Sequence, residues 1–350
     1  MRILQVCPQY YPFLGGVDQH VRNISERLAH THEVTVFTCD PSGQLPKREV
    51  LNEVKVERFH SFSPRNAYHV SFEMFNALRH SSFDVVHGHS YHALPLLFSS
   101  YARRRRFIVT AHYHGHGSTK FRDVLMAFYK PLGQRSFREA DVITAVSQYE
   151  KSLLVRDFRV ESKVVVIPSG IDLDEFRDLE KVSKNYKTIL CVGRMEEYKG
   201  VQYIIRALPL LDKSIRLDIV GSGTYKDRLA GLAKELAVED RVRFYQNLPK
   251  VELLAKYANA DIFLLLSKYE AFGTVIAEAL AAGTPCIVAN TSALTEWIDN
   301  KNCFGIDYPI SVERLVQLIN NVIGKIVSDA KLWDWDDVVQ ATLEVYNRGK

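Results

Sequence analysis

The chain has 350 residues, of which 47% are hydrophobic and 25% are charged, and its formal net charge is +4 at pH 7. These values are typical of a soluble globular protein with about two domains. The charge is too small to indicate a nucleic-acid-binding protein, and no apolar run approaches the roughly 18 residues that a membrane span needs.

The start of the chain and its cysteines predict a cytoplasmic protein. Met1 leads directly into a strand-like run at Ile3–Cys7, without the pattern of a signal peptide. The five cysteines are scattered, odd in number and mostly within apolar runs. This distribution is typical of reduced core residues, and it argues against a disulfide framework or a zinc site.

Strand-like and helix-like runs alternate along nearly the whole chain, which predicts an α/β protein with parallel sheets and right-handed crossovers. We expect two doubly wound domains that face each other across a cleft, at 1–170 and 187–330, with a polar linker at 171–186. The expected strands are Ile3–Cys7, Glu33–Thr38, Val54–Phe59, Asp84–His87, Phe107–Ala111, Asp141–Val146, Lys163–Ile167, Lys187–Val192, Arg216–Val220, Val242–Tyr245, Asp261–Leu266 and Pro285–Val288.

Gly15 and Gly16 follow the first expected strand and precede a helical pattern. Glycine lets a backbone approach a ligand closely, and a helix N-terminus attracts anions. A phosphate site and a plain turn both account for the pair. It is not the dinucleotide fingerprint, because no third glycine follows at the required spacing, and Gly221–Gly223 is likewise only a fragment of that fingerprint.

The run Arg103–Arg106 lies just before the expected strand Phe107–Ala111. We expect a solvated helix end there, because cations suit the C-terminal end of the helix dipole. The alternative is attraction to an anionic membrane surface, which the apolar and basic positions of Ser118–Arg138 support. We rank solvation first, because helices of this kind usually cover a sheet.

Histidines gather in two expected loops at strand ends. His87 and His89 belong to VHGHSYH, and His112 and His114 belong to AHYHGH. Imidazoles at this spacing can bind a metal ion, but no pair of acidic ligands accompanies them. We therefore rank a sugar-contacting or general hydrogen-bonding role above a metal site, with plain solvation of some of these histidines as a further alternative.

The segment CVGRMEEYKG opens the second half of the chain. A strand is expected to end at Val192, and Gly193, Arg194 and Lys199 follow it. Arginine as a planar fork and lysine as a point charge together suit a diphosphate group. The alternative is a pair of surface cations beside the neighbouring glutamates.

The stretch SKYEAFGTVIAEALAAGTP follows the continuous apolar run Asp261–Leu266, which has the composition of a strand covered on both faces. Glu270 is therefore expected at a strand's carboxyl end, and Gly273 at the start of a helix whose first N–H groups are free. The pattern predicts an anion site with a carboxylate beside it. This strengthens the diphosphate interpretation of the arginine–lysine pair.

Four of these stretches together resemble one family. GGVDQHVRNIS, VGRMEEYKG, VGSG and SKYEAFGTVIAEALAAGTP are similar to retaining glycosyltransferases of the GT-B fold, and most of all to family four, which includes bacterial mannosyl-, glucosyl- and N-acetylglucosaminyltransferases. The resemblance covers nearly the whole chain and is densest from Lys187 to Glu296. It implies a hexosyltransferase that uses a GDP- or UDP-linked sugar, with no metal ion and no further cofactor.

The resemblance also implies roles for individual residues. Glu270 would bind hydroxyls of the donor sugar, and Glu278 would hold both ribose hydroxyls. Arg194 and Lys199 would neutralise the departing diphosphate, while a donor phosphate oxygen takes the acceptor's proton. The other residues that it places at the donor are Gly16, Gly193, Gly221, Ala271, Phe272, Gly273, Thr274 and the active-site histidine His112.

The acceptor is expected on the side of the first domain, with His87, His89 and His114 as candidate contacts. A lipid-linked sugar, a phospholipid and a soluble sugar phosphate all fit as acceptors. The first two imply peripheral contact with the inner face of the cell membrane, and no nucleic acid is expected as a partner.

Three positions depart from the family's pattern. Ser169 stands where asparagine is usual, Gln246 stands where glycine is usual, and Ser292–Ala293 replaces a pair of glycines. These positions border the nucleotide and the acceptor, so base preference and acceptor geometry depend on them. The C-terminal segment 331–350 resembles the family's last helix, which crosses back to pack on the first domain with Leu343 and Tyr346 among its anchors.

Two other classes of protein share the architecture. A nucleotide-sugar epimerase would act on the donor without an acceptor, but its sequence signatures are not evident here. A protein that binds the nucleotide sugar without turnover is compatible with the altered loops at Ser169 and Ser292. The intact glutamates and the intact arginine–lysine pair favour glycosyl transfer over both.

Overall fold

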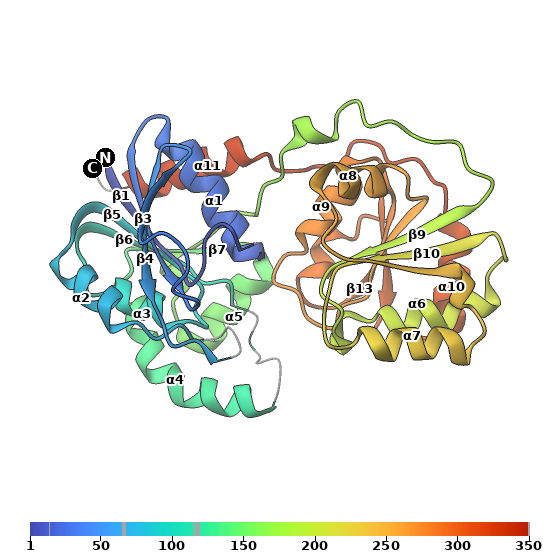
Figure 1. The fold of residues 1–350 in the computed structure, drawn as a ribbon, viewed down its shortest axis with the longest axis horizontal. Helices are drawn as coiled ribbons and strands as arrows, with labels where there is room; N and C mark the ends of the chain where they lie inside the picture. Colours follow the sequence, from blue (N-terminus) through green and yellow to red (C-terminus); the bar gives the residue numbers. More distant parts are fainter. Residues whose placement is uncertain (14, 65–67, 114, 116–119, 349–350) are drawn as a thin grey trace. The chain divides into compact units, whose positions relative to one another are not determined.

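The computed structural model describes residues 1–13, 15–64, 68–113, 115 and 120–348, with the backbone alone for residues 120–128. The chain divides into two compact units (Figure 1). The first consists of Met1–Gly170 and Trp333–Lys350, and the second of Ile171–Leu332. Each unit contains a largely parallel sheet, so the predicted α/β class with two doubly wound domains is confirmed.

The first unit is built on an eight-stranded sheet with the order β3-β4-β2-β1-β5-β6-β7-β8. All neighbouring strands are parallel except β3 and β4. The direction of winding changes between β1 and β5, because the chain runs outward from β1 on one side and outward from β5 on the other. The strands are β1 (Arg2–Val6), β2 (Glu33–Asp40), β3 (Arg48–Leu51), β4 (Val54–His60), β5 (Ser82–His89), β6 (Arg103–Thr110), β7 (Val142–Ala145) and β8 (Val164–Val166).

Helices cover this sheet and bury its apolar residues in two clusters. In one cluster, Val21 and Ile24 of α1 pack with Val338 and Val345 of the C-terminal helix α11. The other cluster contains Phe107 and lies under α2 to α5. In Figure 1, α11 runs beside α1. The helices are α1 (Gly16–Ala29), α2 (Phe72–His80), α3 (Leu94–Ser99), α4 (Lys120–Glu139), α5 (Gln148–Phe158) and α11 (Trp335–Asn347).

The second unit contains a six-stranded, all-parallel sheet with the order β11-β10-β9-β12-β13-β14. Of the two strands at its centre, β12 is fully buried and β9 is buried except for Lys187, as their apolar sequences require. Its strands are β9 (Lys187–Val192), β10 (Ile215–Val220), β11 (Val242–Tyr245), β12 (Ile262–Leu265), β13 (Cys286–Asn290) and β14 (Cys303–Asp307). Its helices are α6 (Val201–Ala207), α7 (Lys226–Glu235), α8 (Lys250–Ala258), α9 (Thr274–Ala281) and α10 (Val312–Val322).

The basic run Arg103–Arg106 is not a helix end, contrary to our expectation, because it forms the first half of β6. Arg104 lies over the Phe107 ring at 4.4 Å and donates to the carbonyls of Ser100 and Ala102. Arg103 and Arg105 on the alternate positions are exposed. Part of this cationic run is therefore structural, which weakens the case that the run serves a membrane surface.

The segment 171–186, which we expected as a linker, lies within the second unit. Asn259 accepts from Val182 and donates to the Glu180 carbonyl, so this segment is bonded to the end of α8. Two strands were missed, β3 and β14. β3 has the charged, short sequence REVL at a sheet edge, and β14 contains a glycine within CFGID, so neither has a continuous apolar run.

Among the described residues, no helix is both long enough and apolar enough to cross a membrane. The segment Ser118–Arg138, named above for a possible membrane contact, begins outside the described residues and continues as α4. Within the described side chains of that helix, Leu132 is exposed and Phe137 is buried against Tyr91. Membrane contact through α4 stays a prediction.

Candidate functional site

The strand order of the second unit places two loops side by side. From β9 the chain crosses to β10 and β11 on one side of the sheet. It then returns to β12, on the other side of β9, and continues to β13 and β14, so two series of strands diverge between β9 and β12. Ligands of open α/β sheets bind at the carboxyl ends of the strands where the winding changes direction. In this unit those ends carry the segments 193–200 and 267–273, which contain most of the predicted donor residues.

Glycines let the strand-end loops of β9 and β10 stack on each other. The Gly193 N–H donates to the Val220 carbonyl at 2.9 Å, and the Gly221 N–H donates to the Tyr245 carbonyl at 2.9 Å. Gly221 has a φ of 141°, and a Cβ atom at this position would lie 2.0 Å from the Gly193 oxygen. A Cβ on Gly193 would meet no atom within 4 Å, so packing does not require glycine at this position. Its φ of 147° does favour glycine, because other residues rarely adopt that angle.

Lys199 and Glu270 meet where the two strand series diverge. Lys199 Nζ donates to Glu270 Oε1 at 2.5 Å, and the two side chains are only 14% and 16% exposed. Burial opposes the charge on Lys199, but the adjoining Glu270 carboxylate outweighs it and raises the pKa of the lysine. The pair is thus a largely buried charge pair at the carboxyl ends of β9 and β12.

Arg194 is exposed, in contrast to Lys199. Its Nη2 donates to the hydroxyl of Tyr198 at 2.7 Å, and Lys199 Nζ lies 5.4 Å from the centre of the same ring. Tyr198 therefore connects the two predicted cations. Lys199 is held by its ion pair with Glu270, whereas Arg194 is exposed and bonded through Nη2 to Tyr198.

The helix α9 starts at the Glu270 loop. Its N-cap, Gly273, has a φ of 93° in the left-handed region that favours glycine. At a helix start the first backbone N–H groups have no carbonyl one turn earlier, and of those in the first turn of α9 the Ile276 N–H donates to the Gly273 carbonyl at 2.8 Å. Ala271, Phe272, Gly273 and Thr274 are all partly exposed, so the predicted backbone contacts with a ligand are open to it.

Glu278 lies one turn into α9 and is positioned by a residue that the sequence did not indicate. The buried Tyr257, on α8, donates its hydroxyl to Glu278 Oε2 at 2.6 Å. Burial raises the pKa of the Glu278 carboxyl, and the Tyr257 hydrogen bond partly opposes that rise. Glu278 thus keeps one carboxylate oxygen unused by Tyr257.

Two side chains support the Glu270 loop from behind. Ser292, at the start of the 3₁₀ helix Ser292–Trp297, accepts from the Glu270 N–H at 3.0 Å. Trp297 donates to the Phe272 carbonyl at 2.8 Å, and the two rings lie 5.1 Å apart. Ser292, one of the departures from the family pattern, therefore contributes a hydrogen bond that a glycine could not make.

In the first unit the winding changes between β1 and β5, and the glycine pair lies just beyond β1. The Gly15 N–H donates to the side chain of Asp18 at 2.9 Å, which caps the start of α1. Gly16 is the first residue of α1, and a Cβ on it would meet no atom within 4 Å. Packing within the protein does not require glycine at this position.

Three imidazoles from three elements meet at the same end of this sheet. They are His20 of α1, His89 at the end of β5 and His112 just after β6. The His20 ring centroid lies 5.0 Å from that of His112 and 6.0 Å from that of His89. One ligating nitrogen of each lies within 4.8 Å of the others. His20 was missed, although its position one helical turn after Gly16 would have directed it to this end of the sheet.

A buried hydrogen-bond network fixes the neighbouring imidazole, His87. Its Nε2 bonds with the Thr110 hydroxyl at 2.7 Å and its Nδ1 with the Tyr346 hydroxyl at 2.8 Å. Tyr346 also accepts from the Gln5 amide at 3.0 Å, and the Gln5 carbonyl oxygen lies 2.8 Å from His89 Nε2. Both nitrogens of His87 are therefore used inside the protein. Of the other candidate acceptor contacts, His114 lies outside the described residues.

Burial keeps this group of histidines neutral. Burial lowers the pKa of His20 to about 4. Burial and the neighbouring His20 together lower the pKa of His87 to about 3. Burial is also the main cause that lowers the pKa of His89 and of His112 well below the ordinary value. At neutral pH these rings act as hydrogen-bond donors and acceptors or as metal ligands, not as charges.

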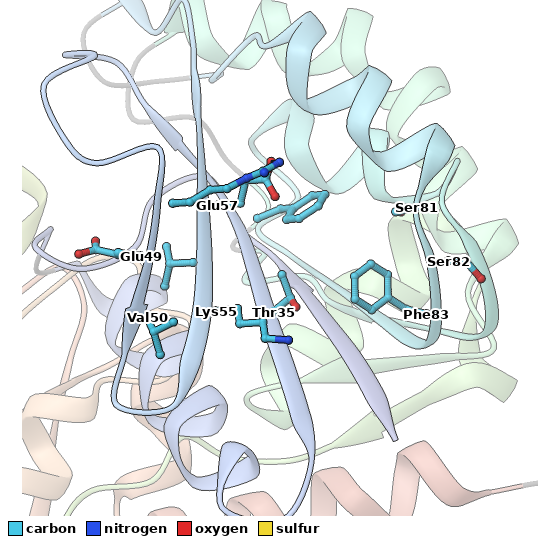
Figure 2. A pocket seen from close by; sticks show the side chains of 11 residues that line it. Thr35, Glu49, Val50, Lys55, Glu57, Ser81, Ser82 and Phe83 are labelled. Atoms are coloured by element: carbon cyan, nitrogen blue, oxygen red, sulfur yellow. The ribbon is translucent and has the colours of Figure 1, made fainter.

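A hollow elsewhere in the first unit does not coincide with these residues. Figure 2 shows it between β2, β3, β4 and the segment 81–83, toward the amino-terminal ends of β2 and β5. Two of its charged side chains, Arg48 and Glu57, pair with each other at 2.8 Å, and Lys55 pairs with Glu33 at 2.7 Å. Its position opposite the strands' carboxyl ends argues against it as the site of chemistry.

Comparison with known families matches both halves of the chain. Residues 14–175 match the model described as Glycosyltransferase Family 4, and residues 172–326 match the model described as Glycosyl transferases group 1. An uncharacterized glycosyltransferase of Methanocaldococcus jannaschii is 29% identical, over 99% of this chain and 98% of that protein. A GDP-mannose-dependent alpha-(1-6)-phosphatidylinositol monomannoside mannosyltransferase of Mycolicibacterium smegmatis is 26% identical, over 94% and 90% of the two chains.

A solved structure resembles the whole chain as well. The HepE protein of Anabaena in complex with UDP superposes with a TM-score of 0.77, over 99% of each chain, at 18% sequence identity. At this identity the likeness establishes the fold. The predicted GT-B architecture is thereby confirmed.

Proposed function

The chain belongs to the family-four type of GT-B glycosyltransferases, and we propose that it moves a hexose from a nucleoside-diphosphate sugar to a hydroxyl acceptor with retention of the anomeric configuration. The observation that carries the proposal is the Lys199–Glu270 pair where the strand series of the second unit diverge. A cation and a carboxylate there, beside the N-terminus of α9, suit a sugar diphosphate, because the cation and the helix N-terminus attract the phosphates and the carboxylate accepts from sugar hydroxyls.

The two charges have separate tasks in this proposal. Lys199 and the exposed Arg194 attract the diphosphate and stabilise the negative charge that grows on it as the glycosidic bond breaks. Glu270 accepts hydrogen bonds from hydroxyls of the transferred sugar. The acceptor hydroxyl attacks the anomeric carbon on the face that the diphosphate leaves, and its proton passes to a phosphate oxygen. The protein then needs no side chain as a base.

The remaining donor contacts follow from α9 and the glycine loops. Glu278 binds the two ribose hydroxyls, held for that purpose by Tyr257. The backbone from Ala271 to Thr274, at the start of α9, binds the sugar and the nearest phosphate group. Because two side-chain cations supply the positive charge, we expect turnover in the presence of a chelator.

The nature of the acceptor is proposed from the relatives. The mycobacterial relative is named for a phosphatidylinositol mannoside, and a further relative from Komagataeibacter xylinus for a cellobiosyl-diphosphopolyprenol. Both are lipid-borne sugars, so we favour a lipid-linked or phospholipid acceptor over a soluble sugar phosphate. His89 Nδ1 is buried and has no hydrogen-bond partner among the described residues, so His89 is our candidate contact with such an acceptor. His112 Nε2 is likewise unpaired, and His112 stays our candidate contact with the donor sugar.

The proposal is tested in two steps. The first is thermal unfolding with EDTA and UDP, GDP or ADP, where a ligand at 100 times its dissociation constant adds about 2.7 kcal/mol to the free energy of unfolding. The second is proton NMR of the reaction with the sugar conjugate of the stabilising nucleotide and a lipid acceptor. An α-linked product from an α-linked donor supports retention; inverted product, or binding only with added metal, contradicts the proposal.

The pH dependence of nucleotide binding should report the ionisation of Glu278. The ribose hydroxyls donate to the ionised carboxylate, while burial raises the pKa of this carboxyl in the free protein. Affinity is therefore complete above that pKa and falls as the pH is lowered through it, by at most about tenfold per pH unit. Isothermal titration with the nucleotide sugar, whose two phosphates carry no group that titrates between pH 4.5 and 8, measures the dependence over that range.

Two variants identify the group that titrates. Tyr257→Phe removes a hydrogen bond that lowers the pKa of Glu278, so the fall in affinity should begin at a higher pH. Glu278→Gln has no charge to lose, so its weaker binding should not vary with pH in this range. An acid limb that persists in Glu278→Gln would show that another group controls it.

The substitution Gly16→Ala should separate a ligand role from a structural one. No atom of the protein lies within 4 Å of the added Cβ, and alanine is the better helix former, so the melting temperature should not fall. If a substrate phosphate approaches the start of α1, the added methyl should raise KM for the donor by about tenfold. An unchanged KM would remove Gly16 from the site.

A further inference from the structure

The cluster formed by His20, His89 and His112 contains polar atoms that the protein leaves unpaired. His89 Nδ1 and His112 Nε2 are buried and have no hydrogen-bond partner among the described residues. Buried nitrogens of this kind are rare in folded proteins, because each costs about 1–3 kcal/mol when left unpaired. Two of them in one group of three imidazoles call for a ligand.

The hydrogen-bond network sets which nitrogen of His89 carries the lone pair. The Gln5 amide nitrogen donates to Tyr346, so the Gln5 carbonyl oxygen is the atom that faces His89 Nε2 at 2.8 Å. A carbonyl only accepts, so Nε2 of His89 carries the proton. Nδ1 of His89 is then a buried acceptor. This is the arrangement that orients metal-bound histidines, in which the second nitrogen donates to a carbonyl.

The other two imidazoles, His20 and His112, are also suited to bind a metal ion. Nδ1 of His20 lies 3.5 Å from the Ser169 hydroxyl, which leaves its Nε2 for another partner. Burial disfavours the charged form of all three rings, and metals bind the neutral form. The cluster thus brings three neutral imidazoles together as potential metal ligands. They come from a helix, from a strand end and from the segment just after another strand.

We propose that His20, His89 and His112 form a binding site for one divalent transition-metal ion of the zinc type, with its remaining coordination position open to solvent or substrate. Zinc–nitrogen bonds of about 2.0–2.1 Å place tetrahedral ligand atoms about 3.4 Å apart. The ligating nitrogens lie within 4.8 Å of one another, so the most distant pair has to close by at most about 1.4 Å to reach this separation. An all-imidazole set favours zinc, copper, nickel or cobalt and disfavours magnesium and calcium.

The metal site has a consequence for glycosyl transfer, and this consequence rests on the proposed function. If His112 contacts the donor sugar, an ion that occupies its lone pair competes with that contact. Micromolar zinc should then inhibit transfer, and a chelator should restore it. The ion would act as an inhibitor, which agrees with transfer that itself needs no metal.

Binding is tested without reference to activity. The protein, free of any histidine tag and stripped with a chelator, is titrated with Co²⁺ while visible absorption is recorded, because four- or five-coordinate Co²⁺ absorbs far more strongly than the hydrated ion. Competition with Zn²⁺ then gives the zinc affinity. We expect one equivalent of Co²⁺, the intense absorption of low coordination, and its loss when one equivalent of Zn²⁺ is added.

Variants assign the ligands. His89→Gln keeps an amide N–H for Gln5 and removes the second nitrogen, so it should weaken zinc binding by about 100-fold or more while the melting temperature changes little. Gln5→Leu removes the bond that orients His89 and should weaken binding by about 10–100-fold. His80→Gln, at an exposed histidine on α2, is the matched control and should bind as the wild type does.

Each outcome decides the proposal. One equivalent of low-coordinate Co²⁺ that is lost in His89→Gln and kept in His80→Gln supports it. Binding that is equal in all variants would show surface histidines only, and an absence of low-coordinate Co²⁺ would show that water or substrate occupies the cluster; either result overturns the proposal. Because donor binding is measured separately, these outcomes do not depend on whether the proposed transfer is correct.

Discussion

Replacing Lys199 with methionine should lower kcat for glycosyl transfer by about two to three orders of magnitude. The lysine is the buried cation beside the leaving diphosphate, and the loss of one preorganised charge of this kind typically costs a factor of about 10²–10³. The substitution also leaves Glu270 without its partner at 2.5 Å in a site where both side chains are largely buried. An unpaired buried charge destabilises the fold by about 3–5 kcal/mol.

The two effects are separated by a double-mutant cycle. In Lys199→Met/Glu270→Gln no charge is left unpaired, so the melting temperature should recover toward that of the wild type. The rate should not recover, because neither the diphosphate nor the sugar regains its contact. Lys268→Met, at an exposed lysine of the same loop, is the control and should keep both rate and stability. A double variant that regains activity would show that Lys199 serves only to neutralise Glu270.

Gly221→Ala should have the largest effect on stability, about 3–5 kcal/mol, because steric overlap and backbone strain act together. The added Cβ would lie 2.0 Å from the Gly193 oxygen, and the φ of 141° is one that alanine rarely adopts. For a unit of this size the loss corresponds to a fall of roughly 10 °C in melting temperature. Chemical denaturation followed by far-UV circular dichroism measures it.

Gly231→Ala is the matched control in the same unit. Gly231 lies within α7, and a Cβ there would meet no atom within 4 Å. Alanine should therefore stabilise the helix by about 0.5–1 kcal/mol. If both variants lost stability equally, the close approach of the Gly221 and Gly193 loops would not be the cause.

The sequence predicted the second unit better than the first. Lys187–Val192 and Val242–Tyr245 were predicted with the bounds that the structure has. For Lys187–Val192 the reason is its apolar run, which marks a buried parallel strand. β3 was missed because an antiparallel edge strand such as REVL lacks such a run. Arg103–Arg106 was misassigned because the charges suggested a helix end, whereas the pairing with β5 makes it a strand.

The candidate site could be predicted only as a set of separate segments. Spacing placed Glu270 and Lys199 each at a strand's carboxyl end, but their ion pair depends on β9 and β12 being neighbours in the sheet. The same holds for Tyr257 and Glu278, whose hydrogen bond joins two different helices. Nothing local in the sequence distinguishes a buried tyrosine that supports a carboxylate from one that fills a core.

The network around His87 has a consequence for how the protein is made. Gln5 and Tyr346, which are hydrogen-bonded to each other, are 341 residues apart in the chain. The first unit therefore cannot complete its core while the ribosome is still translating the second, whose residues form one continuous stretch. The strand that carries Gln5 waits for α11, and only the docking of that helix gives His87 and, through Gln5, His89 their fixed proton positions. The imidazole cluster thus reaches its final hydrogen bonds only after the whole second unit has been synthesised.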